Sequence, residues 1–166
     1  MKSQAKEARK QPDILILGVG NDILMDDGIG VKLVKMLEKK FPDPAASYET
    51  CMMGGFDVLD LMVGYAQVII IDAIKTRKGT PGDIYHLVPE DFKETLHLSN
   101  IHDVSFLQAL KFAKKMNLTI PRKIDIIAIE ILEDRVFGDE FTPQLQTRYP
   151  EIKEQATRMV RELIES

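Results

Sequence analysis

The hydrophobic positions of the chain fall into short apolar runs and into stripes that repeat every three or four residues. Short apolar runs are typical of strands, and a period near 3.6 residues is typical of helices. The runs and the turn residues that bound them predict strands over residues 14–19, 47–53, 67–72 and 123–131, with a looser edge or antiparallel strand over residues 83–88. The stripes predict helices over residues 28–40, 56–62, 104–116 and 152–164, and the polar segment 133–150 is expected to be a loop.

This alternation of strands and helices predicts an α/β fold in three layers, α/β/α, with a mostly parallel sheet. The continuous apolar run at residues 14–19 is typical of a central strand buried on both faces. A length of 166 residues suits one compact domain. We therefore expect a flexible N-terminus over residues 1–12 and a single domain over residues 13–166.

Composition and charge restrict the possible functions. The formal net charge is −4, from 22 basic and 26 acidic side chains, so nucleic acid is not expected as a partner. The longest apolar run, residues 68–71, is too short to span a bilayer, and residues 1–11 lack the apolar segment of a secretory signal. The single cysteine, Cys51, fits a reducing compartment and is expected to be a packed thiol. These features predict a cytoplasmic protein without a membrane partner.

The candidate chemistry begins in the stretch "LGVGNDILMDDGIGV", residues 17–31. Gly18 and Gly20 resemble the start of a dinucleotide-binding loop, but the place of the third glycine is taken by Ile23. Two adjacent carboxylates would also repel a pyrophosphate. We expect Asp26 to cap the following helix and Asp27 to reach a pocket at the sheet edge.

A second acid, Asp72, ends the strand predicted over residues 67–72. If the two strands are neighbours, Asp27 and Asp72 converge at the carboxyl edge of the sheet, where α/β proteins bind their ligands. His97 and His102 lie in the segment before the next helix, whereas His86 lies within a predicted strand. Two carboxylates and one histidine suit a divalent ion such as nickel or zinc, and two carboxylates alone suit acid–base hydrolysis.

Five motifs in order resemble the hydrogenase maturation proteases, the endopeptidases that trim the C-terminus of the large subunit of [NiFe] hydrogenases. They are "LGVGNDILMDDGIGV", the glycine pair at 54–55, "IIIDAI", "PGDIYHLVPED" and a histidine before a helix. The resemblance spans residues 14–164. It implies one α/β domain with a twisted, five-stranded sheet. It also implies a metal-reading site of Asp27, Asp72 and His102, with His97 as the alternative histidine; the first acid is Glu in many members.

The resemblance further implies that the metal belongs to the substrate. The precursor of a [NiFe] hydrogenase large subunit would arrive with nickel inserted, and the site would complete the coordination of that nickel. Either the nickel or a carboxylate, Asp27 or Asp72, would then activate the cleavage. No organic cofactor is expected, and the protein is expected to be monomeric. Two alternatives stay open: a Rossmann-type nucleotide-binding module, and a non-catalytic protein that binds the metal or the precursor.

Overall fold

The computed structural model describes residues 12–52, 55–93 and 101–166, and of residues 92, 93 and 101–105 it describes only the backbone. Residues 1–11, most of the segment predicted to be flexible, lie outside the described part. The elements follow in the order β1 (Ile14–Val19), η1 (Met25–Gly28), α1 (Ile29–Lys40), β2 (Ala46–Cys51), α2 (Phe56–Met62), β3 (Gln67–Ile74), β4 (Ile84–Leu87), η2 (Pro89–Lys93), α3 (Ile101–Lys115), β5 (Lys123–Glu130) and α4 (Pro143–Glu165).

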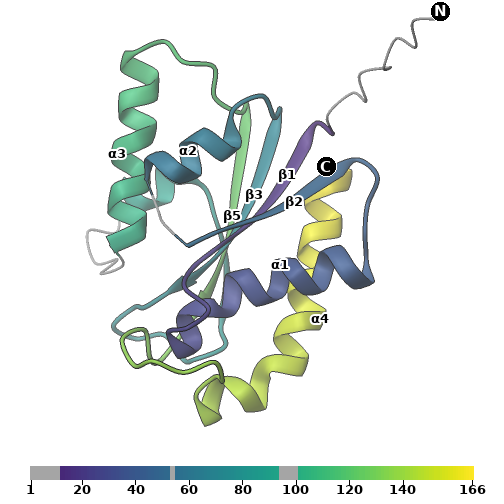
Figure 1. Ribbon diagram of the computed structural model, residues 1–166, viewed down its shortest axis with the longest axis vertical. Coiled ribbons are helices and arrows are strands. Elements are labelled where there is room, and N and C mark those ends of the chain that lie inside the picture. The colour runs from purple at the N-terminus through teal and green to yellow at the C-terminus, as the bar shows by residue number, and fades with distance from the viewer. Residues whose placement is uncertain (1–11, 53–54, 94–100) are drawn as a thin grey trace, which may run out of the picture.

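The sheet has five strands in the order β2-β1-β3-β5-β4, of which β4 alone runs antiparallel. Helices α2 and α3 cover one face, and α1 and α4 cover the other (Figure 1). The three-layer α/β/α prediction is therefore confirmed, including the antiparallel strand at one edge. In the described part of the chain, every helix is too short or too polar to cross a membrane.

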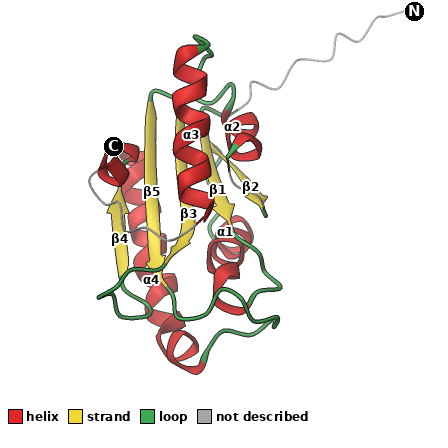
Figure 2. Cartoon of the chain, turned by 90° about the vertical axis from the view of Figure 1, so that its left-hand side faces the viewer, coloured by secondary structure: helices red, strands yellow, loops and turns green. Residues whose placement is uncertain are grey.

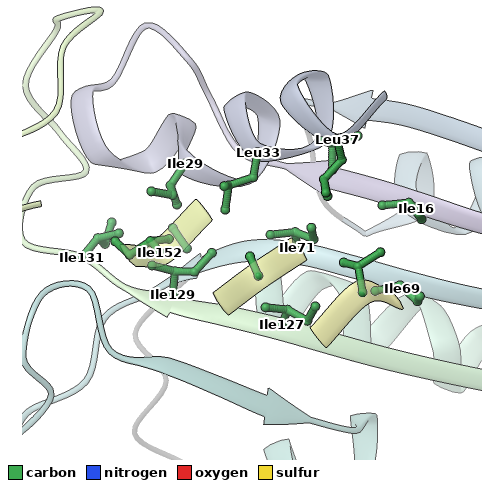
Figure 3. Packing of buried hydrophobic residues seen from close by; sticks show 14 of the residues in the cluster. Ile16, Ile29, Leu33, Leu37, Ile69, Ile71, Ile127, Ile129, Ile131 and Ile152 are labelled. Atoms are coloured by element: carbon green, nitrogen blue, oxygen red, sulfur yellow. The ribbon is translucent and has the colours of Figure 1, made fainter. Parts of the chain in front are cut away.

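Strand β3 lies at the centre of both hydrophobic cores. Ile69 and Ile71 point toward α1 and α4 and meet Leu33 and Ile129 (Figure 3). Val68 and the other even-numbered residues of β3 point the opposite way, toward α2 and α3. Burial of each isoleucine side chain stabilises the fold by roughly 1.5–3 kcal/mol. Because both faces of β3 are buried, a shift in its register would be costly.

Among the element boundaries that differ from the prediction, three have a clear physical reason. Helix α4 begins at Pro143 and continues through Pro150, so the predicted loop 133–150 ends at Thr142. Proline is tolerated in the first turn of a helix, and buried Leu145 already starts the apolar stripe that continues at Ile152. Helix α3 begins at Ile101, three residues before the predicted start, and β3 extends two residues beyond its predicted end because it pairs with β5 as far as Glu130.

Candidate active site

The carboxyl ends of β1 and β3 meet the start of α1 in a closely packed junction. The two strands are hydrogen-bonded neighbours, with Gly18 opposite Ile71. A methyl group on Gly30 would lie 2.2 Å from the Ile71 carbonyl oxygen and 2.6 Å from the Val19 carbonyl oxygen. Only a glycine lets α1 approach the strand ends this closely. The turn before α1, η1, also contacts β3, so the junction brings the segment of Asp27 to the segment of Asp72.

Asp27 lies in η1, folded back on the loop that leaves β1. Asp27 is 4% exposed, and its Oδ2 accepts the backbone N–H of Asn21 at 2.8 Å. A methyl group on Gly20, where φ is +139°, would lie 2.1 Å from the Asp27 carbonyl oxygen. The Gly-x-Gly pattern therefore serves a tight turn around a carboxylate.

Asp72 lies within β3, opposite Ala128 of β5, and not at the end of the strand. The residue is 5% exposed, and its Oδ1 accepts the N–H of Ala73 at 2.8 Å. By strand alternation its side chain shares a face with Ile70 and Ile74, which pack in the cluster beneath α2 and α3. Asp72 thus projects from the sheet on the side where α3 lies.

Asp26 does not cap α1, contrary to the prediction from the sequence. Its fully buried carboxylate accepts the N–H groups of Leu132, Glu133 and Thr142 at 3.2, 3.1 and 2.7 Å, and the Thr142 hydroxyl at 2.9 Å. The start of α1 has no side-chain cap. All four donors come from the loop between β5 and α4, so Asp26 anchors that loop to η1. A contact across more than 100 positions leaves no local sequence signal.

The three histidines have different outcomes. His102 is the second residue of α3, which begins at the carboxyl end of the sheet on the same side as Asp72 (Figures 1 and 2), but its side chain is not described. His97 lies outside the described residues. His86 on β4 is hydrogen-bonded to buried Asp125, with Nε2 and Oδ1 2.8 Å apart, away from the junction.

The metal-reading triad stays a prediction. Among the side chains that the structure describes, no three His, Cys, Asp or Glu residues group so as to hold a metal ion, and His102 is not among those side chains. Cys51 is buried in the apolar cluster beneath α2 and α3, as predicted for a packed thiol.

Glu130, at the end of β5, is a buried acid that the sequence analysis did not single out. It is 1% exposed, and its carboxylate accepts the N–H and the hydroxyl of Thr76 at 2.7 and 2.9 Å and the Tyr85 hydroxyl at 3.3 Å. Burial, and then the charge of Glu130, raise the pKa of the Tyr85 phenol. The sequence feature that could have indicated this role is an acid at the end of the apolar strand β5. Glu130 holds the loop between β3 and β4 against the sheet edge.

The chain is similar to known proteins over most of its length. A family model of the hydrogenase maturation proteases matches residues 31–165, most of the chain. The chain belongs to the hydrogenase maturation protease family. It is 30% identical over 158 residues to the hydrogenase 2 maturation protease of Escherichia coli (strain K12), and the match covers 90% of this chain and 91% of that one.

Solved structures of hydrogenase maturation proteases share the fold. The hydrogenase maturating endopeptidase HybD from E. coli superposes with a TM-score of 0.70 at 27% identity, covering 90% of this chain and 92% of that chain. The [NiFe] hydrogenase maturation protease HybD from Thermococcus kodakarensis gives a TM-score of 0.64 at 25% identity, covering 88% and 97%. The predicted family and the predicted activity, an endopeptidase that processes the precursor of a hydrogenase large subunit, are therefore confirmed.

Proposed function

We propose that this hydrogenase maturation protease removes a C-terminal peptide from the precursor of a [NiFe] hydrogenase large subunit that already carries nickel. Asp27, Asp72 and His102 are the residues that we assign to the nickel of the precursor. The protein itself then needs no resident metal and no organic cofactor. The observation that carries this proposal is the packing of two buried carboxylate segments at one junction, at the carboxyl ends of β1 and β3.

The burial of the two acids supports an electrostatic role. Asp27 and Asp72 are 4% and 5% exposed, and each accepts a backbone N–H group at 2.8 Å. A buried carboxylate is costly unless hydrogen bonds or a cation stabilise its charge. A divalent ion delivered by the substrate would supply such a cation, and carboxylate oxygens are among the ligands that nickel accepts beside imidazole and thiolate.

The position of α3 supports His102 rather than His97 as the third ligand. The helix lies over the face to which Asp72 points, and it starts at the carboxyl end of the sheet (Figure 2). His102 is in its first turn. A residue in the first turn of a helix has a backbone fixed by the helix, which suits a ligand that must meet two acids from other elements.

The nickel of the precursor would polarise or position the scissile amide, as metal ions do in hydrolases. The chain contributes two carboxylates that can bind this ion or take a proton from water. Cys51 is buried beneath α2 and α3, which argues against a thiol nucleophile. We therefore assign Asp27 and Asp72 as the residues of an aspartic-type or metallo-type mechanism.

We also propose that the protein works in the cytoplasm, as a monomer. A single cysteine held as a buried free thiol is compatible with a reducing compartment.

Cleavage of a nickel-loaded precursor tests the proposed function. The purified protein is incubated with nickel-loaded and nickel-free large-subunit precursor, and the precursor mass is measured. We expect loss of a C-terminal peptide only with nickel present. Asp27→Ala and Asp72→Ala should each lower the rate about 10³-fold, because each removes a ligand or a base. Asp60→Ala, an exposed acid on α2, is the matched control and should cleave normally.

Two further outcomes sharpen the test. His102→Ala should lose cleavage and His97→Ala should retain it; the reverse pattern would move the third ligand to His97. Circular dichroism must show a folded Asp72→Ala protein. Equal cleavage of nickel-free precursor, or full activity of a folded Asp72→Ala variant, would refute the nickel-dependent mechanism.

A further inference from the structure

Exposed apolar side chains lie on the two loops that flank Asp27, and the three most exposed of them are Ile23, Val136 and Phe137. Ile23 is 51% exposed, Val136 is 52% exposed and Phe137 is 78% exposed, the highest value among the exposed large apolar residues of the described chain. Single exposed apolar residues are common on protein surfaces, but apolar side chains grouped on neighbouring loops are typical of binding sites. We refer to Ile23, Val136 and Phe137 together as the apolar tip.

Backbone hydrogen bonds join the two loops of the apolar tip. The N–H of Gly138 donates to the Ile23 carbonyl oxygen at 3.0 Å, and the N–H of Met25 donates to the Gly138 carbonyl oxygen at 2.8 Å. These bonds form a parallel bridge between Leu24 and Gly138. Ile23 and Phe137 therefore sit on adjacent backbone, although they are more than 100 positions apart in the sequence.

The loop that carries Val136 and Phe137 is held at several points. Asp26 accepts four hydrogen bonds from residues at the two ends of this loop. Glu133 Oε1 accepts the N–H groups of Arg135 and Val136 at 2.8 and 3.2 Å, inside the loop itself. The exposure of the tip is thus a property of a fixed loop. A surface that is ordered before binding loses little conformational entropy when a partner docks.

Charged residues lie next to Val136 and Phe137 on their loop and on the elements that this loop contacts. Lys75 and Asp134 form an ion pair at 2.9 Å that links this loop to the one after β3, and Lys32 of α1 donates to the Asp139 carbonyl oxygen. An apolar centre inside a polar rim is the usual composition of a protein–protein interface. The tip is also continuous with the proposed site, because Ile23 and Asp27 belong to one turn closed by the Asn21–Asp27 hydrogen bond.

We propose that the apolar tip is the docking surface for the protein substrate, and that it packs against an apolar patch on the folded part of the hydrogenase large-subunit precursor. The inference rests on the proposed function for the position of the cleavage site. It assigns recognition of the precursor to residues separate from the nickel ligands. Docking at the tip would bring the scissile segment to Asp27 and Asp72 by proximity.

A binding measurement separates docking from cleavage. The affinity of nickel-loaded precursor is measured by calorimetry in the cleavage-deficient Asp72→Ala background, with Phe137→Ala, Phe137→Leu or Met116→Ala added. We expect Phe137→Ala to weaken binding about tenfold or more, because truncation of a central aromatic anchor commonly has this effect. Phe137→Leu should recover most of the affinity. Met116→Ala, which truncates an exposed apolar side chain just after the end of α3, should bind like the parent.

Kinetics and oligomeric state complete the test. With Asp72 intact, the loss for Phe137→Ala should appear in KM. Unchanged affinity of a folded Phe137→Ala protein would overturn the docking proposal, and so would a shift from dimer to monomer with precursor affinity retained, which would assign the tip to a second copy of the chain. Failure of the proposed function is distinguishable, because in that case the unmodified protein would leave the nickel-loaded precursor uncut whatever its affinity.

Discussion

Asp26 and Asp27 are adjacent acids in one turn, but their carboxylates have different partners. Asp26 points inward and satisfies four donors of the loop before α4, whereas Asp27 folds back on the loop after β1. The sequence predicted an acid at this edge of the sheet, and the structure has one there. It could not predict which of the pair anchors a distant loop, because Leu132, Glu133 and Thr142 come close only after the sheet has formed.

Replacing Asp26 should destabilise the fold. Asp26→Ala would leave three buried N–H groups and the Thr142 hydroxyl without their acceptor, so we expect the free energy of unfolding to fall by about 3 kcal/mol. Urea denaturation measures this loss. Asp22→Ala breaks only the partly exposed ion pair with Lys35 and should cost less than about 1 kcal/mol. Equal losses in the two variants would show that the anchor contributes little.

Most elements could be predicted from the sequence because their apolar residues follow a local pattern, a short run in a strand or a stripe in a helix. Strand β1 and helix α2 have their predicted bounds. The start of α4 could not be predicted, because Pro150 is typical of a helix end and the stripe that begins at Leu145 crosses it. The extension of β3 past Asp72 depends on its pairing with β5, which is a tertiary contact.

Packing between α1 and the strand ends gives a prediction at the element scale. Gly30→Ala would place a methyl group 2.2 Å from the Ile71 carbonyl oxygen, so α1 must move away from the sheet. We expect a loss of about 2–3 kcal/mol in the free energy of unfolding and a fall in precursor cleavage. Lys39→Ala, on the exposed side of the same helix, should change stability by no more than about 0.5 kcal/mol. Wild-type stability of Gly30→Ala would contradict the close packing.

One ion pair links the edge of the sheet to α4 at the scale of the whole molecule. Arg148 donates to Asp83 at 2.9 Å and to the Pro81 carbonyl oxygen at 3.1 Å. The hydrogen bond from Arg148, followed by the backbone N–H of Thr80, lowers the pKa of Asp83. A carboxyl group whose pKa is lower in the folded state stabilises the fold above its unfolded pKa, and this contribution disappears as the pH falls through the lowered value.

The difference in stability between the wild type and Arg148→Met should therefore be larger at neutral pH than in acid. Thermal unfolding at neutral pH and at a pH below the ordinary pKa of an aspartate measures this difference. Since both side chains are partly exposed, the effect on Tm should be small. Arg158→Met, on the exposed face of the same helix, should show no such dependence on pH. A stability difference for Arg148→Met that does not change with pH would exclude the pairing with Asp83 as its cause.

The last turn of α4 lies at the amino ends of the strands, whereas Asp27 and Asp72 lie toward their carboxyl ends. The side chain of Gln67, the first residue of β3, donates to the Leu163 carbonyl oxygen at 3.0 Å, and Lys123, the first residue of β5, contacts Ser166. A biosensor surface coupled through a linker at Ser166 would therefore hold the enzyme with its strand ends and the apolar tip facing the solution. In that orientation a large folded precursor has free access, so its association can be recorded directly on the immobilised protein.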